Sequence, residues 1–141
     1  MIMVQGYVYW SIYLRAATAK KVKDVHLPRI ETALGHHQFK WEISSEKERP
    51  GIYRVINFQN IESASASELV LQVLKAAFSL VDGWHICGLQ NLNYGFINGI
   101  TGGWKRQGNI NKNSSIDDML FDISTGRVLG VNDDGGWMKE D

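Results

Sequence analysis

The amino-acid sequence predicts a two-layer α+β domain whose elements follow the order β-α-β-β-α-β, with a β-hairpin added at the C-terminal end. Three observations support this fold class. The segment from Tyr7 to Arg15 alternates in polarity, as a half-buried strand does. Two longer segments carry apolar residues at helical spacing behind a capping residue. Short strand-like runs bounded by turn residues separate and follow these two segments.

The first strand is predicted over Tyr7 to Arg15, with one face toward the core. Its inward residues are Val8, Trp10, Ile12 and Leu14, and its outward residues are Tyr7, Tyr9, Ser11, Tyr13 and Arg15. Thr18 then caps a helix that runs to Leu34 and stops at Gly35. Pro28 lies inside this helix and is expected to kink it or restart it.

A hairpin and a second helix are predicted next. The hairpin strands cover residues 38–44 and 52–58, and the turn between them is polar. Ser65 and Glu68 have capping-box spacing and open the clearest helix, which ends at Asp82-Gly83. Its predicted buried stripe is Leu69, Val70, Val73, Leu74, Ala77 and Val81. A fourth strand follows from Trp84 to Leu89.

These elements predict a ferredoxin-like sandwich, in which a four-stranded, mainly antiparallel sheet carries two helices on one face. Residues 93–113 are rich in glycine and asparagine and predict a glycine-broken hairpin or a long loop. A further hairpin, from 119–123 and 127–131, is expected to extend the sheet. We predict a single domain over 1–141, with a core at about 5–90, an extension at 91–131 and a flexible tail at 132–141.

Composition narrows the function classes. The formal net charge is zero, which argues against a nucleic-acid partner, because such a protein usually carries a basic excess to neutralise phosphates. The charge is uneven, because residues 1–60 carry nine Lys/Arg against five Asp/Glu, whereas residues 111–141 carry three against seven. A single cysteine excludes an internal disulfide. The absence of a signal-like segment or a membrane-spanning apolar run predicts a cytoplasmic protein without a membrane partner.

No residue pattern predicts a reaction centre. His85 and Cys87 are two apart on a predicted strand, so they share a face and could bind a metal or act as base and nucleophile. The stronger interpretation is a small buried cysteine beside a satisfied histidine. Metal-binding, phosphate-loop and nucleophile-elbow motifs are missing. We therefore expect no catalytic residue, no metal and no cofactor.

The first candidate surface is the outward face of the opening strand, formed by Tyr7, Tyr9, Tyr13 and Arg15. Tyrosines there suit a protein interface, because each gives a large contact area and one polar group. Base stacking on RNA is a weaker alternative. The purely structural alternative is that the C-terminal hairpin, or a second copy of the chain in a homodimer, covers this face.

The second candidate surface combines aromatic and acidic residues after Leu89. Its members are Tyr94, Phe96, Trp104, Asp117, Asp118 and Asp122. Exposed aromatics beside charges are typical of interface hot spots, and an acidic patch complements a partner with a basic active site. An ordinary loop followed by a solvated edge is the alternative.

The chain resembles small bacterial immunity proteins of contact-dependent growth inhibition. The features behind this resemblance are the β-α-β-β-α-β core, the aromatic-glycine loop 94–104 and the acidic stretch 117–134. The resemblance implies tight, non-catalytic binding to a cognate protein toxin, often a nuclease. The basic front half departs from it, because nuclease blockers are commonly acidic. The alternative function is a small ferredoxin-like enzyme or ligand-binding module with a cleft near His85 and Cys87.

Overall fold

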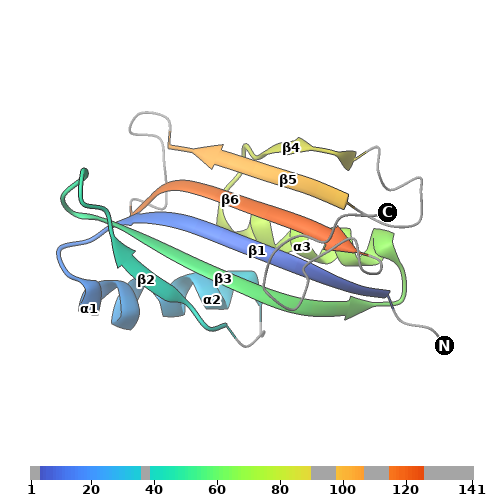
Figure 1. Cartoon of the computed structure of the whole chain (residues 1–141), viewed down its shortest axis with the longest axis horizontal. Coiled ribbons are helices and arrows are strands. Elements are labelled where there is room, and N and C mark those ends of the chain that lie inside the picture. Colours follow the sequence, from blue (N-terminus) through green and yellow to red (C-terminus); the bar gives the residue numbers. More distant parts are fainter. Residues whose placement is uncertain (1–3, 36–38, 90–97, 107–114, 126–141) are drawn as a thin grey trace, which may run out of the picture.

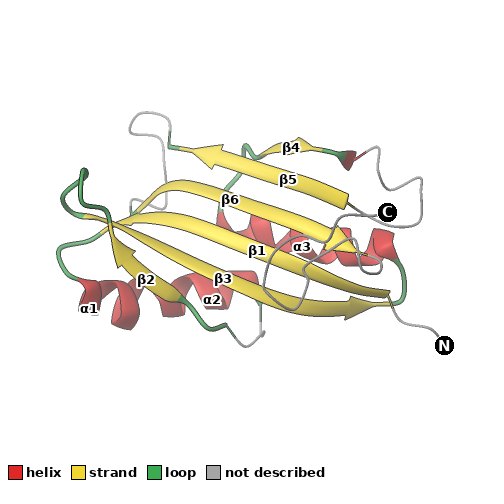
Figure 2. Ribbon diagram, in the orientation of Figure 1, coloured by secondary structure: helices red, strands yellow, loops and turns green. Residues whose placement is uncertain are grey.

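The computed structural model describes residues 4–35, 39–89, 98–106 and 115–125. These residues form a six-stranded antiparallel sheet with the helices on one of its faces (Figure 1, Figure 2). The α+β class and the single helical layer are therefore as predicted.

Strand β1 (Val4–Arg15) establishes the two sides of the sheet. Its predicted inward residues, Val8, Trp10, Ile12 and Leu14, are all at most 3% exposed and belong to one hydrophobic core. The alternate side chains point to the opposite face because successive residues of a strand alternate. The predicted inward face of this strand is confirmed.

The strand order is β2-β3-β1-β6-β5-β4. The bounds are β2 (Glu42–Ser45), β3 (Ile52–Ser63), β4 (His85–Cys87), β5 (Asn98–Lys105) and β6 (Ile116–Thr125). Strand β1 lies between β3 and β6, while β4 pairs with β5 at the far edge of the described sheet (Figure 1). The two added strands, β5 and β6, thus stand between β1 and the strand that follows the second helix.

The segment after Leu89 differs from its sequence prediction. Asn98–Lys105 is a strand paired with β6, so a long loop is wrong for these residues. The predicted strand 119–123 lies inside β6. The predicted return strand 127–131 and the flexible tail 132–141 lie outside the described residues.

Strand β2 is shorter than predicted because its ladder with β3 is interrupted at its N-terminal end. The Lys40 backbone N–H donates to Oδ1 of Asn57 at 2.9 Å instead of to a β3 carbonyl. Asn57 is buried, so its side chain holds this position firmly. Regular pairing therefore starts only at Glu42, opposite Ile56.

The first helical segment is a composite of α1 (Ala19–Lys21), a π-helical turn η1 (Val22–His26) and α2 (Leu27–Leu34). Thr18 caps it by accepting from the Lys21 N–H, and Gly35 ends it with a φ of 104°. Pro28 has no N–H and crowds the preceding turn, and the wider π turn stands immediately before it. The restart predicted at this proline is confirmed.

Helix α3 (Ala66–Leu80) is capped by Ser65, whose hydroxyl accepts from the Glu68 N–H at 3.1 Å. Leu69, Val70, Val73 and Ala77 of the predicted stripe are buried, while Leu74 and Val81 are half-buried. None of the described helices is both long enough and apolar enough to cross a membrane.

An aromatic cluster joins the central strands to the end of α3. The Phe121 ring lies 5.4 Å from Trp10 and 5.2 Å from Trp84, centroid to centroid. Trp84 donates its indole N–H to the carbonyl of Ala77 at 2.8 Å, which fixes the cluster to the helix. Gly102 on β5 makes room for Phe121, because a β-carbon at this position would lie 2.2 Å from the ring.

Gly102→Ala is therefore expected to destabilise the fold by about 2 kcal/mol, since Phe121 is held between two tryptophans and cannot move away freely. The matched control is Gly103→Ala, whose added β-carbon meets nothing within 4 Å. Urea denaturation of both variants measures the difference. Equal stabilities of the two variants would contradict this account of the packing.

Candidate functional site

The tyrosines of the first predicted surface and two aspartates of the second, Asp118 and Asp122, lie on one face of the sheet, opposite the helices. We call this the outer face. The register places Tyr9 opposite Asp122 and Tyr13 opposite Asp118. Residues paired across neighbouring strands project to the same side, so these tyrosines and aspartates stand side by side. Tyr7 belongs to the same row of β1.

Apolar side chains add to the outer face. Phe58 lies opposite Tyr9 on β3 and is 48% exposed, and Leu120 lies opposite Ser11 on β6 and is 44% exposed. The Tyr7 ring stacks against Phe58 with centroids 5.6 Å apart. Such a group of exposed aromatic and aliphatic side chains on one face is typical of a binding surface.

Arg54 orders the tyrosines of the outer face. Its Nη2 donates to the Tyr9 hydroxyl at 2.8 Å, and its Nε donates to the Ser11 hydroxyl at 3.1 Å. The same guanidinium lies over the Tyr13 ring, 5.8 Å from the centroid. Because one rigid group contacts these three side chains, their rotamers are restricted before any partner arrives.

Asp117 has a structural role at one end of the outer face. It lies at the irregularity where the β1–β6 register shifts. Arg15 donates to its Oδ1 from Nε at 2.9 Å, and Arg49 donates to its Oδ2. Arg49 also lies 5.6 Å from the Tyr13 centroid. Asp117 thus joins β1, β6 and the turn between β2 and β3.

The negative charges of Asp118 and Asp122 are less well compensated than that of Asp117. Burial raises the pKa of Asp118; nearby Lys105 and Arg49 oppose this rise, and Asp117 adds to it. Burial also raises the pKa of Asp122, opposed only by the backbone N–H of Ile123. Oδ1 of Asp122 is buried and has no hydrogen-bond partner within the described residues. Its charged form is therefore disfavoured in the folded protein.

Trp104 is the aromatic residue of the second predicted surface that lies among the described residues, and it does not join this group. Tyr94 and Phe96 lie outside the described residues. Trp104 pairs with buried Met119, so it is on the helix side of the sheet. There it packs against the core and donates its indole N–H to the carbonyl of Asp82 at 3.0 Å.

The sequence did not predict a role for four residues of this site: Phe58, Leu120, Arg49 and Arg54. Alternation within the third and last strands could have assigned Phe58 and Leu120 to a face. Their position beside the tyrosines follows from strand pairing, which local periodicity does not contain. Arg49 was assigned to a solvated turn, but that turn folds back toward Tyr13.

His85 and Cys87 lie on edge strand β4, opposite Gly103 and Thr101. Both side chains are exposed, so the interpretation of Cys87 as a small buried residue is wrong. Within the part of the chain that the structure describes, no three His, Cys, Asp or Glu residues are grouped so that they could hold a metal ion.

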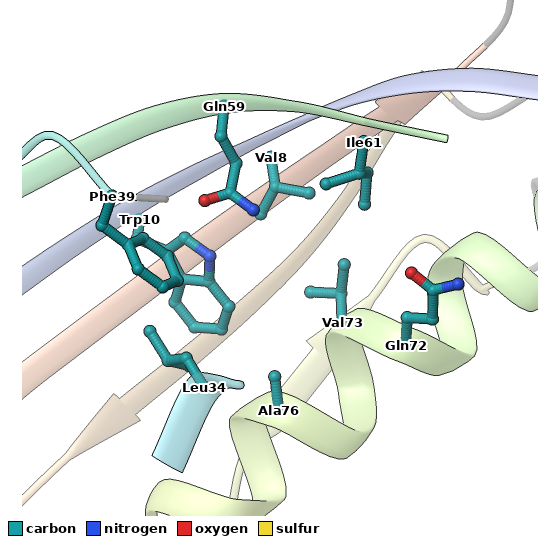
Figure 3. Close-up of a pocket in the computed structure, with 9 residues that line it drawn as sticks. All are labelled: Val8, Trp10, Leu34, Phe39, Gln59, Ile61, Gln72, Val73 and Ala76. Atoms are coloured by element: carbon teal, nitrogen blue, oxygen red, sulfur yellow. The ribbon is translucent and has the colours of Figure 1, made fainter. Parts of the chain in front are cut away.

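A pocket lies on the other side of the sheet, between β3 and the two helices α2 and α3 (Figure 3). It is small and partly open to solvent. Its lining residues are Val8, Trp10, Leu34, Phe39, Gln59, Ile61, Gln72, Val73 and Ala76. This pocket is not lined by His85 or Cys87, where the sequence had suggested a cleft as the alternative.

Comparison with protein-family models, curated proteins and solved structures finds no match to this chain.

Asp122→Asn is expected to raise stability at neutral pH, by about 2 °C in melting temperature. A carboxyl group whose folded pKa is raised destabilises the fold above that pKa, and the penalty disappears as pH falls below its unfolded value. The gain should therefore shrink toward pH 4, where the wild-type carboxyl group becomes protonated.

Asp82→Asn is the matched control, because Asp82 is exposed and its contribution to the Trp104 contact is its backbone carbonyl. Thermal melting of both variants between about pH 4 and 7 measures the effect. A constant or negative change for Asp122→Asn would contradict the assignment of Asp122 as a destabilised carboxylate.

Proposed function

We propose that this chain is a non-catalytic binding protein that neutralises a toxin domain by covering it with the outer face of the sheet. The observation that carries the proposal is that Asp118 and Asp122 of the second predicted surface stand beside the tyrosines of the first. Tyr9 and Tyr13 stand opposite Asp122 and Asp118, respectively, with Phe58 exposed beside them. Large aromatic groups, apolar contacts and acceptors for charged donors thus share one surface.

The order already present in this surface supports tight binding. Binding becomes less favourable when flexible side chains must be fixed at the interface. Arg54 fixes Tyr9 and Tyr13 through a hydrogen bond and a cation–π contact, so less is lost when a partner docks. Tyrosine and arginine are also the residue types in which interface binding energy concentrates.

The charges suit a partner with basic side chains. Asp118 and Asp122 lie among the tyrosines, away from the helix layer. A nuclease-type toxin binds phosphate with lysine and arginine, and carboxylates at the matching positions attract such a site. Arg15 and Arg49 are engaged with Asp117, which partly compensates their charges. Arg54 and Lys105 project on the same face, and Lys105 lies opposite Asp118, so Asp122 is the acceptor that nearby cations compensate least.

The finer fold assignment belongs to the same proposal. We infer a ferredoxin-like arrangement in which the β5–β6 hairpin is inserted beside β1, at the position of the fourth strand. The direction of each described strand is compatible with this, since all neighbours are antiparallel. We also infer action in the bacterial cytoplasm, where a toxin domain of contact-dependent growth inhibition would be met.

The test begins with the protein encoded by the adjacent upstream gene, expressed as its C-terminal domain. We expect this domain to arrest growth, the chain to restore growth, and the two to form a stoichiometric complex. Phe58→Ala and Leu120→Ala should each weaken that complex by about 2 kcal/mol, as hot-spot truncations do. Isothermal titration measures the affinities, and thermal melting verifies folding.

The chain offers matched controls on the opposite side of the molecule. Phe78 and Leu71 on α3 are 45% and 50% exposed, close to the values for Phe58 and Leu120. Their alanine variants should bind within about 0.5 kcal/mol of wild type. Equal losses on both sides, or none on either, would reject the outer face as the site. A chain that neither binds the domain nor restores growth would reject this toxin as the partner.

A further inference from the structure

A second feature of the molecule is a stretch of β3 at the sheet edge that pairs with no second strand among the described residues. Strand β3 is 12 residues long, but β2 pairs only with its segment from Tyr53 to Ile56. From Asn57 to Ser63, β3 pairs with β1 on one side and has no strand partner on the other among the described residues (Figure 1).

The direction of the backbone groups along this edge follows from two hydrogen bonds. Glu46 N–H donates to the Ile52 carbonyl at 3.0 Å on the β2 side. In an antiparallel ladder every second residue bonds to the same neighbour. The β2-side series therefore continues past Ile56 to Phe58, Asn60 and Glu62, whose N–H and C=O groups point outward.

The side of β3 that faces β1 gives the same assignment independently. Ala16 N–H donates to the Gly51 carbonyl at 3.0 Å on the β1 side. The alternate residues that follow, including Gln59 and Ile61, therefore direct their backbone groups toward β1. The register between β1 and β3 has no shift, so this alternation holds along the whole strand.

Among the described residues, the one charged residue of this edge stretch is Glu62, and little else protects the edge against pairing. Native edge strands are commonly blocked by lysine, proline or a bulge. The stretch Asn57 to Ser63 contains no proline and no basic residue, and its pairing with β1 is regular. An unblocked row of donors and acceptors is a template for an added strand.

The pocket lies directly under this edge. Gln59 and Ile61 project from β3 on the helix side, and Val73 and Ala76 face them from α3 (Figure 3). Phe39 also lines the pocket, at the end nearer to β2. A strand added beside β3 would direct every second side chain toward this side of the sheet. Backbone pairing and an apolar side-chain site thus occur together, as in peptide recognition by strand addition.

We propose that the β3 edge from Phe58 to Glu62 binds an extended segment of another protein, antiparallel to β3, with one aliphatic side chain in the pocket. The antiparallel direction continues the line of β2. Exposed Lys40 lies near one end and Glu62 at the other. Charge complementarity therefore selects a segment with a basic N-terminal end and an acidic C-terminal end. This proposal does not depend on the outer face or on the toxin assignment.

Amide hydrogen exchange followed by NMR tests the edge in the free chain. We expect the amides of Phe58, Asn60 and Glu62 to exchange at least about tenfold faster than those of Gln59 and Ile61, which bond to β1. Adding the capped peptide Lys-Thr-Val-Thr-Val-Thr-Glu should then slow the three outward amides. A scrambled peptide of the same composition, Lys-Val-Val-Thr-Thr-Thr-Glu, should have a weaker effect.

Variants separate the backbone from the side chains. Asn60→Pro removes an outward N–H that no strand among the described residues pairs with, so it should weaken binding of the alternating peptide about tenfold. Asn60→Ala keeps the N–H and should bind normally. Ala76→Leu fills the pocket and should also weaken binding, whereas Ser79→Leu adds the same side chain at an exposed position of α3. Thermal melting confirms that each variant folds.

Three results would overturn the proposal. The first is slow exchange of Phe58, Asn60 and Glu62 in the free monomer, which would mean that the edge is already covered. The second is a concentration-dependent dimer, by sedimentation equilibrium, that protects the same amides, because a second copy would then be the occupant. The third is an alternating peptide that leaves fast-exchanging outward amides unchanged up to its solubility limit.

Discussion

Pairing of β1 on both of its edges is the constraint on which the rest of the structure depends. This strand contacts β3 along its full length and β6 along most of it. Once its register is set, the inward row is buried beneath the helices and the tyrosine row must face outward. A slip by one residue would put Tyr9 into the core and expose Trp10. The outer face is therefore a consequence of core packing and cannot shift independently of it.

The same pairing explains why charged groups cluster near Tyr13. The register irregularity between Tyr13 and Leu14 allows Asp117 to reach Arg15 and Arg49. Exposed ion pairs contribute little on their own, but the Asp117 side chain is only 12% exposed and accepts from two guanidinium groups. This arrangement holds the turn after β2 against the end of β1, close to the tyrosines that Arg54 orders.

Local sequence patterns predicted what depends on local chemistry. Thr18 and Ser65 cap helices because their hydroxyls satisfy free N–H groups, and this requires no knowledge of the remainder of the chain. Alternation likewise identified the two faces of β1. The patterns could not give the strand order, because β6 reaches its place beside β1 through pairing over more than 100 residues of sequence.

The errors near Trp104 and Lys40 have specific causes. Trp104 was expected on a binding surface, but it shares its side of β5 with Gly102, which must face the core to accommodate Phe121. The strand predicted from Gln38 was shortened by a single side-chain amide, that of Asn57. Neither effect leaves a signal in hydrophobic periodicity, since each depends on a residue from a different strand.

Asp122 connects stability with binding. Its carboxyl group is partly removed from water in the free protein, and one buried oxygen has no hydrogen-bond partner among the described residues. Desolvation is the main term that opposes ion pairing at an interface. If part of this desolvation cost is already met during folding, a hydrogen bond from a partner's donor to Asp122 stabilises the complex more than the same bond to an exposed aspartate would. In the binding function proposed above, the free-energy penalty that Asp122 imposes on the unbound protein would be the physical basis for its strength as an acceptor at the outer face.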